Sequence, residues 1–190
     1  VFLDSLAAQI AEGDRTGLDR LFTEEALDPP VIAWAPSAAR LPVAPLPFLL
    51  DYWQSLPRLD DLPLARALDG LAMKPALGYL LLLEELEQGH DFLYRVYGTQ
   101  VAARANMDLT GTRTSEIRSS RYVAPFFLAV YRAAMVRRQH VYTRHNPPPE
   151  VSAQTWDRLI LPLVDDDGMV SRILVGNVAG AWRSTLDQRR

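Results

Sequence analysis

Apolar positions in the first part of the chain recur at helical spacing, with one proline-rich interruption. Residues 2–27 place leucine, isoleucine and phenylalanine on one helical face. Gly13 and Gly17 interrupt that face, so one helix and two short helices both fit the pattern. Little apolar sequence nearby can cover the face, so we expect it to pack on the outer face of the sheet or on a second chain. Residues 28–47 contain six prolines, which fix backbone angles and remove amide donors. This segment is therefore predicted to be an extended arm, and neither a helix nor a central strand.

Two further helices and one ambiguous segment follow the arm. Residues 48–56 have an amphipathic pattern that ends before Pro57, and leucine spacing predicts a helix from about residue 64 to residue 73. The apolar run at residues 76–86 is too dense for periodicity to decide, because it fits both a buried strand and the core of a helix. We expect it to be mostly strand, beside the strand that comes next.

A strand, a short helix and a long helix are predicted in the middle of the chain. Residues 92–97 alternate strand-forming side chains. The helical pattern that follows stops at Asn106, a residue that tolerates the left-handed conformation needed just past a helix end. Residues 122–139 contain the clearest helix, with Pro125 in its first turn, where a missing amide donor does no harm.

Three more strands are predicted in the last part of the chain, at residues 140–145, 155–164 and 170–179. The last two flank the acidic turn "DDDG", which contains Gly168 and is typical of a β-hairpin. Strands on both sides of a helical middle indicate an antiparallel sheet with helices on one face. The predicted fold class is therefore α+β.

Several short segments, taken in order, resemble the PAS domain family. They cover about residues 50–182 and are "YW" (52–53), "YRVYGT" (94–99), "DLTGT" (108–112), "RLILPL" (158–163) and "VSRILVG" (170–176). Each is weak alone, and their order and spacing give the resemblance its weight. The closer match is to a bacterial PAS-like group that is often found as single-domain proteins of alphaproteobacteria. Where that group usually has a glycine before "DLTG", this chain has Asn106 and Met107.

The resemblance implies a five-stranded antiparallel sheet whose concave face is cradled by the helices of residues 99–139. Residues 1–47 lie outside the resemblance, and we assign them to an N-terminal helical cap and proline-rich arm, followed by a PAS-like domain at residues 48–190. PAS domains hold a small molecule in the cavity or fill it with side chains, and they commonly form homodimers through N-terminal helices. The resemblance thus implies a stand-alone sensory or signalling domain. It would bind a small molecule, a signalling protein partner or both, and would act in trans on an effector.

Charge and composition limit the kinds of partner and the cellular location that we expect. The 190 residues carry 20 basic and 23 acidic side chains, a formal net charge of −3, so no basic field is present to hold nucleic acid or an anionic membrane. The longest apolar run, "LGYLLLL", is too short to cross a bilayer, and the first residues lack the basic region of a signal peptide. Cysteine is absent, which fits a reducing compartment. The expected location is the cytoplasm.

A ligand site is expected between the long helix and the sheet. Aromatic rings with one or two arginines match a mostly apolar pocket, although large aromatic side chains also pack in ordinary cores. Strand alternation lets either arginine face the cavity or solvent, and Phe127 replaces Phe126 if the long helix is rotated. The candidate ligand-binding residues are Tyr94, Arg95, Tyr122, Phe126, Phe127, Tyr131, Trp156 and Arg158.

Motifs for other chemistry are weak or absent in the sequence. Gly98 belongs to neither a dinucleotide fingerprint nor a phosphate loop. The three histidines lack the spacing of metal ligands, and "DDDG" lacks the alternating acids of a calcium loop, so no metal site is assigned. His140 lies only at the end of the long helix, the helix in which some PAS proteins hold haem through a histidine.

The cofactor and the catalytic residues are left unassigned. Without cysteine, covalent flavin photochemistry is excluded, whereas non-covalent flavin stays open. The chain shows no identifiable nucleophile or base, so it is predicted not to be an enzyme. The alternative is a small α+β enzyme, an isomerase or hydrolase, that uses a pocket Asp, Glu or His as its base.

Overall fold

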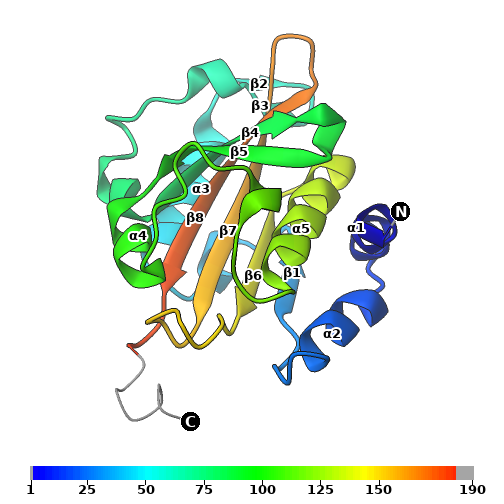
Figure 1. Cartoon of the computed structure of the whole chain (residues 1–190). Helices are drawn as coiled ribbons and strands as arrows, with labels where there is room; N and C mark the ends of the chain where they lie inside the picture. Colours follow the sequence, from blue (N-terminus) through cyan, green and yellow to red (C-terminus); the bar gives the residue numbers. More distant parts are fainter. Residues whose placement is uncertain (1, 183–190) are drawn as a thin grey trace.

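A six-stranded antiparallel sheet with helices on both faces forms the centre of the protein (Figure 1). The structure is a computed structural model, and it describes residues 2–182. The strand order is β1-β6-β7-β8-β4-β5. In chain order, the strands are β1 (Val31–Trp34), β4 (Leu80–Leu86), β5 (Asp91–Tyr97), β6 (Val141–His145), β7 (Trp156–Val164) and β8 (Val170–Ala179). The predicted α+β class and the antiparallel sheet are confirmed.

The sixth strand comes from the proline-rich arm. Strand β1 pairs with β6 at the edge of the sheet, in a register that places Val31 opposite Arg144 and Trp34 opposite Val141. Residues 31–34 of the arm are thus extended, as predicted, and its prolines lie outside these four paired residues. An edge position is where a proline-flanked strand is tolerated, because only one side of the strand needs amide donors. The rest of the prediction is wrong in part, because Ala38–Arg40 form a 3-10 turn and residues 45–47 begin helix α3 (Pro45–Ser55).

Helices α4 (Thr99–Ala105) and α5 (Val123–Arg137) lie on the concave face of the sheet, as Figure 1 shows. Helix α4 ends at Asn106, whose φ of 56° is the left-handed conformation expected there. The N-terminal region forms two helices, α1 (Phe2–Glu12) and α2 (Thr16–Thr23), and α1 runs against α5. Buried residues of both N-terminal helices belong to the same apolar cluster as α5 and this face of the sheet.

The opposite face of the sheet is covered by α3 (Pro45–Ser55). Its buried residues, Leu46, Leu49, Leu50 and Trp53, share an apolar cluster with alternate residues of β7. The Trp53 indole donates a hydrogen bond of 2.9 Å to the carbonyl of Pro162. Gly176 of β8 permits this close approach, because a Cβ there would lie 2.7 Å from both Leu46 and Leu49. Helices therefore cover two faces, where the sequence predicted one.

Two local predictions are wrong. Residues 64–73 do not form a helix; a 3-10 turn at Ala65–Ala67 is followed by irregular backbone. The Asp69 side chain accepts the amide of Leu71 at 2.8 Å, a local bond that competes with helix formation. The apolar face of residues 2–27 was expected on the outer face of the sheet or on a second chain. It packs instead on α5 of the same chain.

The remaining elements are short. Strands β2 (Arg58–Leu59) and β3 (Leu62–Pro63) form a separate two-stranded sheet, and residues 76–86 are divided between a 3-10 turn at Lys74–Tyr79 and β4. The predicted hairpin joins β7 and β8, with Asp165 accepting amides of the turn and Gly168 at a φ of 79°. The division into cap and PAS-like domain at residue 47 stays a prediction.

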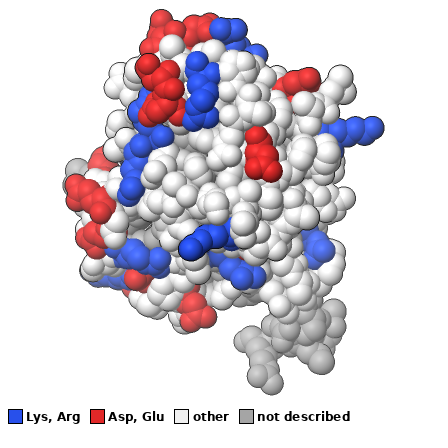
Figure 2. All heavy atoms as spheres, turned by 180° about the vertical axis from the view of Figure 1, so that it is seen from behind, with Lys and Arg blue, Asp and Glu red and all other residues white. Residues whose placement is uncertain are grey.

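The face seen in Figure 2 shows few charged side chains across its middle, and acidic and basic groups lie mixed along one side. No broad field of one sign is visible there, in keeping with the small formal net charge. Within residues 2–182, no helix combines the length and the apolar character that a membrane span requires.

Candidate functional site

A small cavity of about 50 Å³ lies on the concave face of the sheet, under α4 and α5. The segment after α4 and the proline loop after β6 complete its walls. Most of its lining is apolar and comprises Leu81, Ala105, Met107, Leu109, Ile117, Val123, Phe127, Pro147, Pro148, Val151 and Trp156. The polar residues of the lining are Tyr94, Tyr97, Ser119, His145, Arg158 and Asn177.

Arg158 is the central feature of the site. It lies on β7 opposite Thr143 of β6 and Asn177 of β8, and its side chain is only 1% exposed. Its Nη2 donates a hydrogen bond to the Tyr131 hydroxyl, and its guanidinium lies 4.0 Å from the centre of the Phe127 ring. These contacts hold the guanidinium in place, and neither supplies a negative charge.

The charge of Arg158 has no counter-ion in the described part of the chain. No carboxylate of residues 2–182 forms an ion pair with it, and its Nε and Nη1 atoms have no hydrogen-bond partner there. Burying an ion without a partner costs several kcal/mol, even after relaxation and water entry. Desolvated contacts between a cation and aromatic rings recover about 2 kcal/mol or more, but they supply no full negative charge. Arg158 is therefore a buried cation with open hydrogen-bond donors in an apolar setting.

His145 adds a neutral polar group to the cavity. It is buried, and the aromatic rings of Phe126 and Phe127 lie 5.0 and 5.7 Å from its ring centre. Burial and the nearby positive charge of Arg158 hold its pKa well below the usual value of 6.5, so the imidazole is uncharged near neutral pH. Its Nδ1 has no partner within residues 2–182.

Asn177 and the tyrosines supply further hydrogen-bonding groups. The Oδ1 atom of Asn177 is buried without a partner among the described residues. The hydroxyls of Tyr94 and Tyr131 lie 3.4 Å apart. Burial raises the pKa of Tyr94 and of Tyr97 well above the usual value of 10, so both phenols stay protonated and can donate. The described lining thus offers one cation, neutral donors and acceptors, and no carboxylate.

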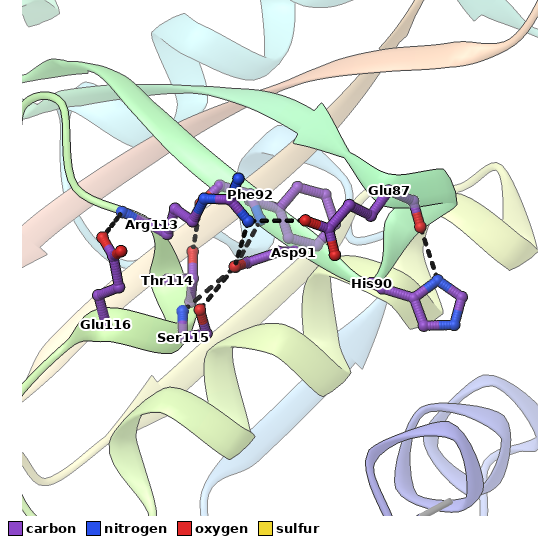
Figure 3. Close-up of polar contacts among 8 residues, drawn as sticks. All are labelled: Glu87, His90, Asp91, Phe92, Arg113, Thr114, Ser115 and Glu116. Atoms are coloured by element: carbon purple, nitrogen blue, oxygen red, sulfur yellow. Dashed lines mark hydrogen bonds and ion pairs between the residues drawn. The ribbon is translucent and has the colours of Figure 1, made fainter.

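A polar network fixes the wall formed by the segment after α4 (Figure 3). Asp91, at the start of β5, is buried and accepts hydrogen bonds from the Ser115 hydroxyl at 2.6 Å and from its amide at 3.2 Å. The Thr114 hydroxyl donates to the carbonyl of Phe92 at 3.1 Å, and Arg113 reaches Glu87 at 2.7 Å. These bonds attach residues 113–116 to β5 and so position the neighbouring lining residue Ile117.

The proline loop that follows β6 closes the cavity from another side. Asn106, just after α4, donates from Nδ2 to the Ser152 hydroxyl at 3.0 Å and to the Glu150 carbonyl at 3.3 Å. The Ser119 hydroxyl donates to the Glu150 carboxylate at 3.0 Å. Side-chain bonds near the molecular surface therefore connect this loop to the segment opposite it.

The structure brings together half of the residues that the sequence proposed for ligand binding. Tyr94, Phe127, Trp156 and Arg158 line the cavity. The others lie outside the lining. Tyr131 lies behind Arg158 and holds it, Tyr122 and Phe126 pack against Phe22 of α2, and Arg95 is exposed and paired with Glu84.

Arg95 therefore does not line this cavity, for a simple geometric reason. Successive residues of a strand point to opposite faces, and Tyr94 takes the cavity face of β5.

The sequence reasoning missed His145 and Asn177, and an available signal could have found them. Both are polar residues within segments that the sequence predicts to be strands. Once β6, β7 and β8 are paired in antiparallel register, Asn177 lies beside Arg158, and His145 lies beside Trp156. Each therefore shares a face of the sheet with a residue that was proposed.

The model of the PAS domain family matches residues 43–178. This match spans more than half of the chain, and the chain belongs to the PAS domain family. No curated protein and no solved structure matched the chain. Membership indicates a sensory or signalling role in general terms, since PAS domains are generally sensory domains without enzymatic activity.

Proposed function

We propose that this protein is a sensory PAS domain that binds a small molecule in the cavity around Arg158. It passes the signal to an effector carried by another protein. The observation that supports binding most strongly is the buried guanidinium, which has no counter-ion among the described residues and lies in the cavity wall. A charge kept only for structure would be expected to have a carboxylate partner, because an unpaired buried charge destabilises the fold.

The small-molecule part is tested by native mass spectrometry of the full chain, followed by a thermal-shift screen of a metabolite library. A ligand that binds only the folded state raises the melting temperature by mass action. Replacing Trp156, which lines the cavity, with alanine is expected to remove the shift beyond its own effect on stability. The control is Trp182→Ala, since Trp182 is 57% exposed and lies outside the lining. If no compound shifts the wild type, this part of the proposal fails.

The protein-partner part is tested separately. We propose that the signalling partner binds the ligand-loaded and ligand-free forms with different affinity, because a ligand shifts a conformational equilibrium only through differential affinity. Affinity capture with and without the ligand found in the screen measures this difference. A partner that is retained equally in both states would contradict a sensory role.

We also propose a homodimer that uses the outward side of the N-terminal helices. Their apolar side is already buried on α5, so the contact would use exposed residues such as Phe2, which is 60% exposed. Light scattering during size-exclusion chromatography tests this part, and a monomer mass at micromolar concentration would contradict it. Turnover of a bound compound that is lost in His145→Gln would favour an enzyme instead, because His145 is the lining side chain best suited to act as a base.

A further inference from the structure

We propose that the ligand is a short monocarboxylate whose carboxylate pairs with Arg158 and whose hydrocarbon end lies against the apolar lining. This inference rests on the proposed small-molecule function and names its ligand class. Four properties of the cavity lead to it: the unpaired guanidinium, the total charge of the lining, the cavity volume, and the mixture of polar and apolar walls.

The guanidinium favours a planar oxyanion. The Nε and Nη1 atoms are unpartnered, and Nη2 carries a second N–H beside the one that it donates to Tyr131. A carboxylate can accept from this second N–H together with Nε or Nη1, which is the planar two-oxygen geometry that arginine favours. Charge-assisted pairs of this kind are roughly twice as strong as neutral hydrogen bonds. The contacts with Tyr131 and Phe127 fix the guanidinium before the ligand arrives, which lowers the entropy lost on binding.

The charge of the lining favours a single negative charge. Arg158 is the only Arg, Lys, Asp or Glu among the described lining residues, and the depressed pKa of His145 keeps the imidazole neutral. A monoanion would leave the buried site neutral. A dianion such as hydrogen phosphate would leave one negative charge buried without a partner, at a cost of several kcal/mol.

The volume favours a small ligand. A cavity of about 50 Å³ holds a few water-sized spheres, since each water needs at least about 10–15 Å³ measured in this way. A carboxylate with roughly one to three further carbons fits that space, whereas most of a flavin or haem would lie outside it. The methyl or ethyl group would lie against apolar lining residues such as Ala105 and Val151.

The remaining polar groups of the lining can form hydrogen bonds with a bound carboxylate. Asn177 is the cross-strand neighbour of Arg158, and its amide can donate as well as accept. The Nδ1 atom of His145 is unpartnered in the described chain and donates in one tautomer of the neutral ring. Both groups lie in the same lining as Arg158, so a single small anion can satisfy several groups that protein atoms leave open.

The test uses the purified full chain in chloride buffer that is free of carboxylates. Formate, acetate, propionate and butyrate are compared with sodium chloride at equal ionic strength and with acetamide, the neutral counterpart of acetate. At about 100 times the dissociation constant we expect the best carboxylate to raise the melting temperature by roughly 5–10 °C. Acetamide and chloride should give no comparable shift. Calorimetric titration then measures the affinity directly.

Two arginine variants locate the site. Arg158→Met should weaken carboxylate binding by at least about tenfold, since a charge-assisted hydrogen bond contributes roughly 1.5–3 kcal/mol. Arg95→Met is the matched control, because Arg95 lies on the same sheet, is exposed and does not line the cavity. The affinity of this variant for carboxylate should equal that of the wild type. If Arg158→Met does not fold, Ala105→Leu takes its place, since it fills the cavity and leaves Arg158 intact.

The outcomes separate this inference from the proposed function. Equal shifts with acetate and acetamide, or binding that persists in Arg158→Met or in Ala105→Leu, would overturn the inference. A neutral or dianionic library compound that binds in the cavity while no monocarboxylate does would overturn it as well, and would leave the proposed function standing. If no compound of any charge binds, both fail.

Discussion

Arg158 illustrates how one residue can be explained in two ways that differ in their energetic consequences. As a structural residue it would stabilise the fold through Tyr131 and Phe127. As a ligand-binding residue it would destabilise the ligand-free fold, because its burial costs more than these contacts return. Its measured effect on stability therefore bears on function.

We expect Arg158→Met to be at least as stable as the wild type when no carboxylate is present. Methionine fills much of the same space without a buried charge, and Tyr94 and Tyr131 remain within reach of each other. The free energy of unfolding in urea, measured in chloride buffer, should be unchanged or higher. A loss of more than about 2 kcal/mol would show that Arg158 has mainly a structural role.

His145 makes stability depend on pH. Its pKa in the folded state is far below 6.5, while the unfolded chain has an ordinary histidine. Below pH 6.5 the unfolded state therefore binds more protons, and the free energy of unfolding falls as the pH falls. The slope should reach about 1.4 kcal/mol per pH unit until the folded state is protonated too. Above pH 6.5 His145 is neutral in both states, so its contribution to the free energy of unfolding is fully present and no longer changes with pH.

The pH dependence is measured by urea unfolding between pH 7.5 and pH 5 in the wild type, His145→Gln and His140→Gln. Burial also lowers the pKa of His140, so this residue contributes in the same direction. Each variant should lose only the part of the pH dependence that the replaced histidine contributes. A wild-type stability that is flat across this range would contradict the assignment, and so would an undiminished slope in His145→Gln.

At the level of elements, Asn106 connects the end of α4 to the proline loop. Its left-handed backbone costs an ordinary residue about 1–2 kcal/mol, and its side chain donates to Ser152 and Glu150. We expect Asn106→Ala to lower the free energy of unfolding by about 2 kcal/mol. Asn106→Gly keeps the backbone conformation and should lose less. Equal stability of the alanine variant and the wild type in urea would contradict this account.

Periodicity predicted most of the elements because each carries its own local signal. The alternation in β5, the β-branched and aromatic residues of β7 and β8, the stop at Asn106 and the hairpin at Gly168 all depend on residues close in sequence. The predicted helix at residues 64–73 failed because tertiary contacts decided the outcome. Leu64 and Met73 are buried in the cluster under α3, and a local bond of Asp69 breaks the helical ladder between them.

The site was only partly predictable for a related reason. Alternation along a strand shows that neighbours such as Tyr94 and Arg95 face opposite ways, but it does not show which of them faces the core. The rotation of α5 is set by packing against the sheet and α1, and this rotation places Phe127 in the cavity and Phe126 against Phe22. Such choices depend on contacts that are distant in sequence.

At the scale of the whole molecule, the N-terminal helices are part of the main core. Phe22 of α2 packs against Tyr122 and Phe126, with ring centres 4.7 and 5.1 Å away, and the ring of His145 lies 6.4 Å from it. Asp4 of α1 forms an ion pair with Arg132 of α5. The cap thus supports one side of the candidate site through these aromatic contacts.

We therefore expect a chain that begins at residue 28 to aggregate or to melt well below the full chain, because the buried surface of α5 would be exposed.

A single substitution tests the same contact without truncation. Phe22→Ala should lower the free energy of unfolding by about 3–5 kcal/mol, since Phe22 is fully buried. Leu71→Ala is the control, and it should change stability by less than about 0.5 kcal/mol because that side chain is 84% exposed and lies outside the proposed dimer contact. Thermal melts and urea unfolding measure both effects. A truncated chain that stays folded with the melting temperature of the full protein would show that the cap is an independent addition. The support that Phe22 gives to His145 would then have no bearing on the cavity.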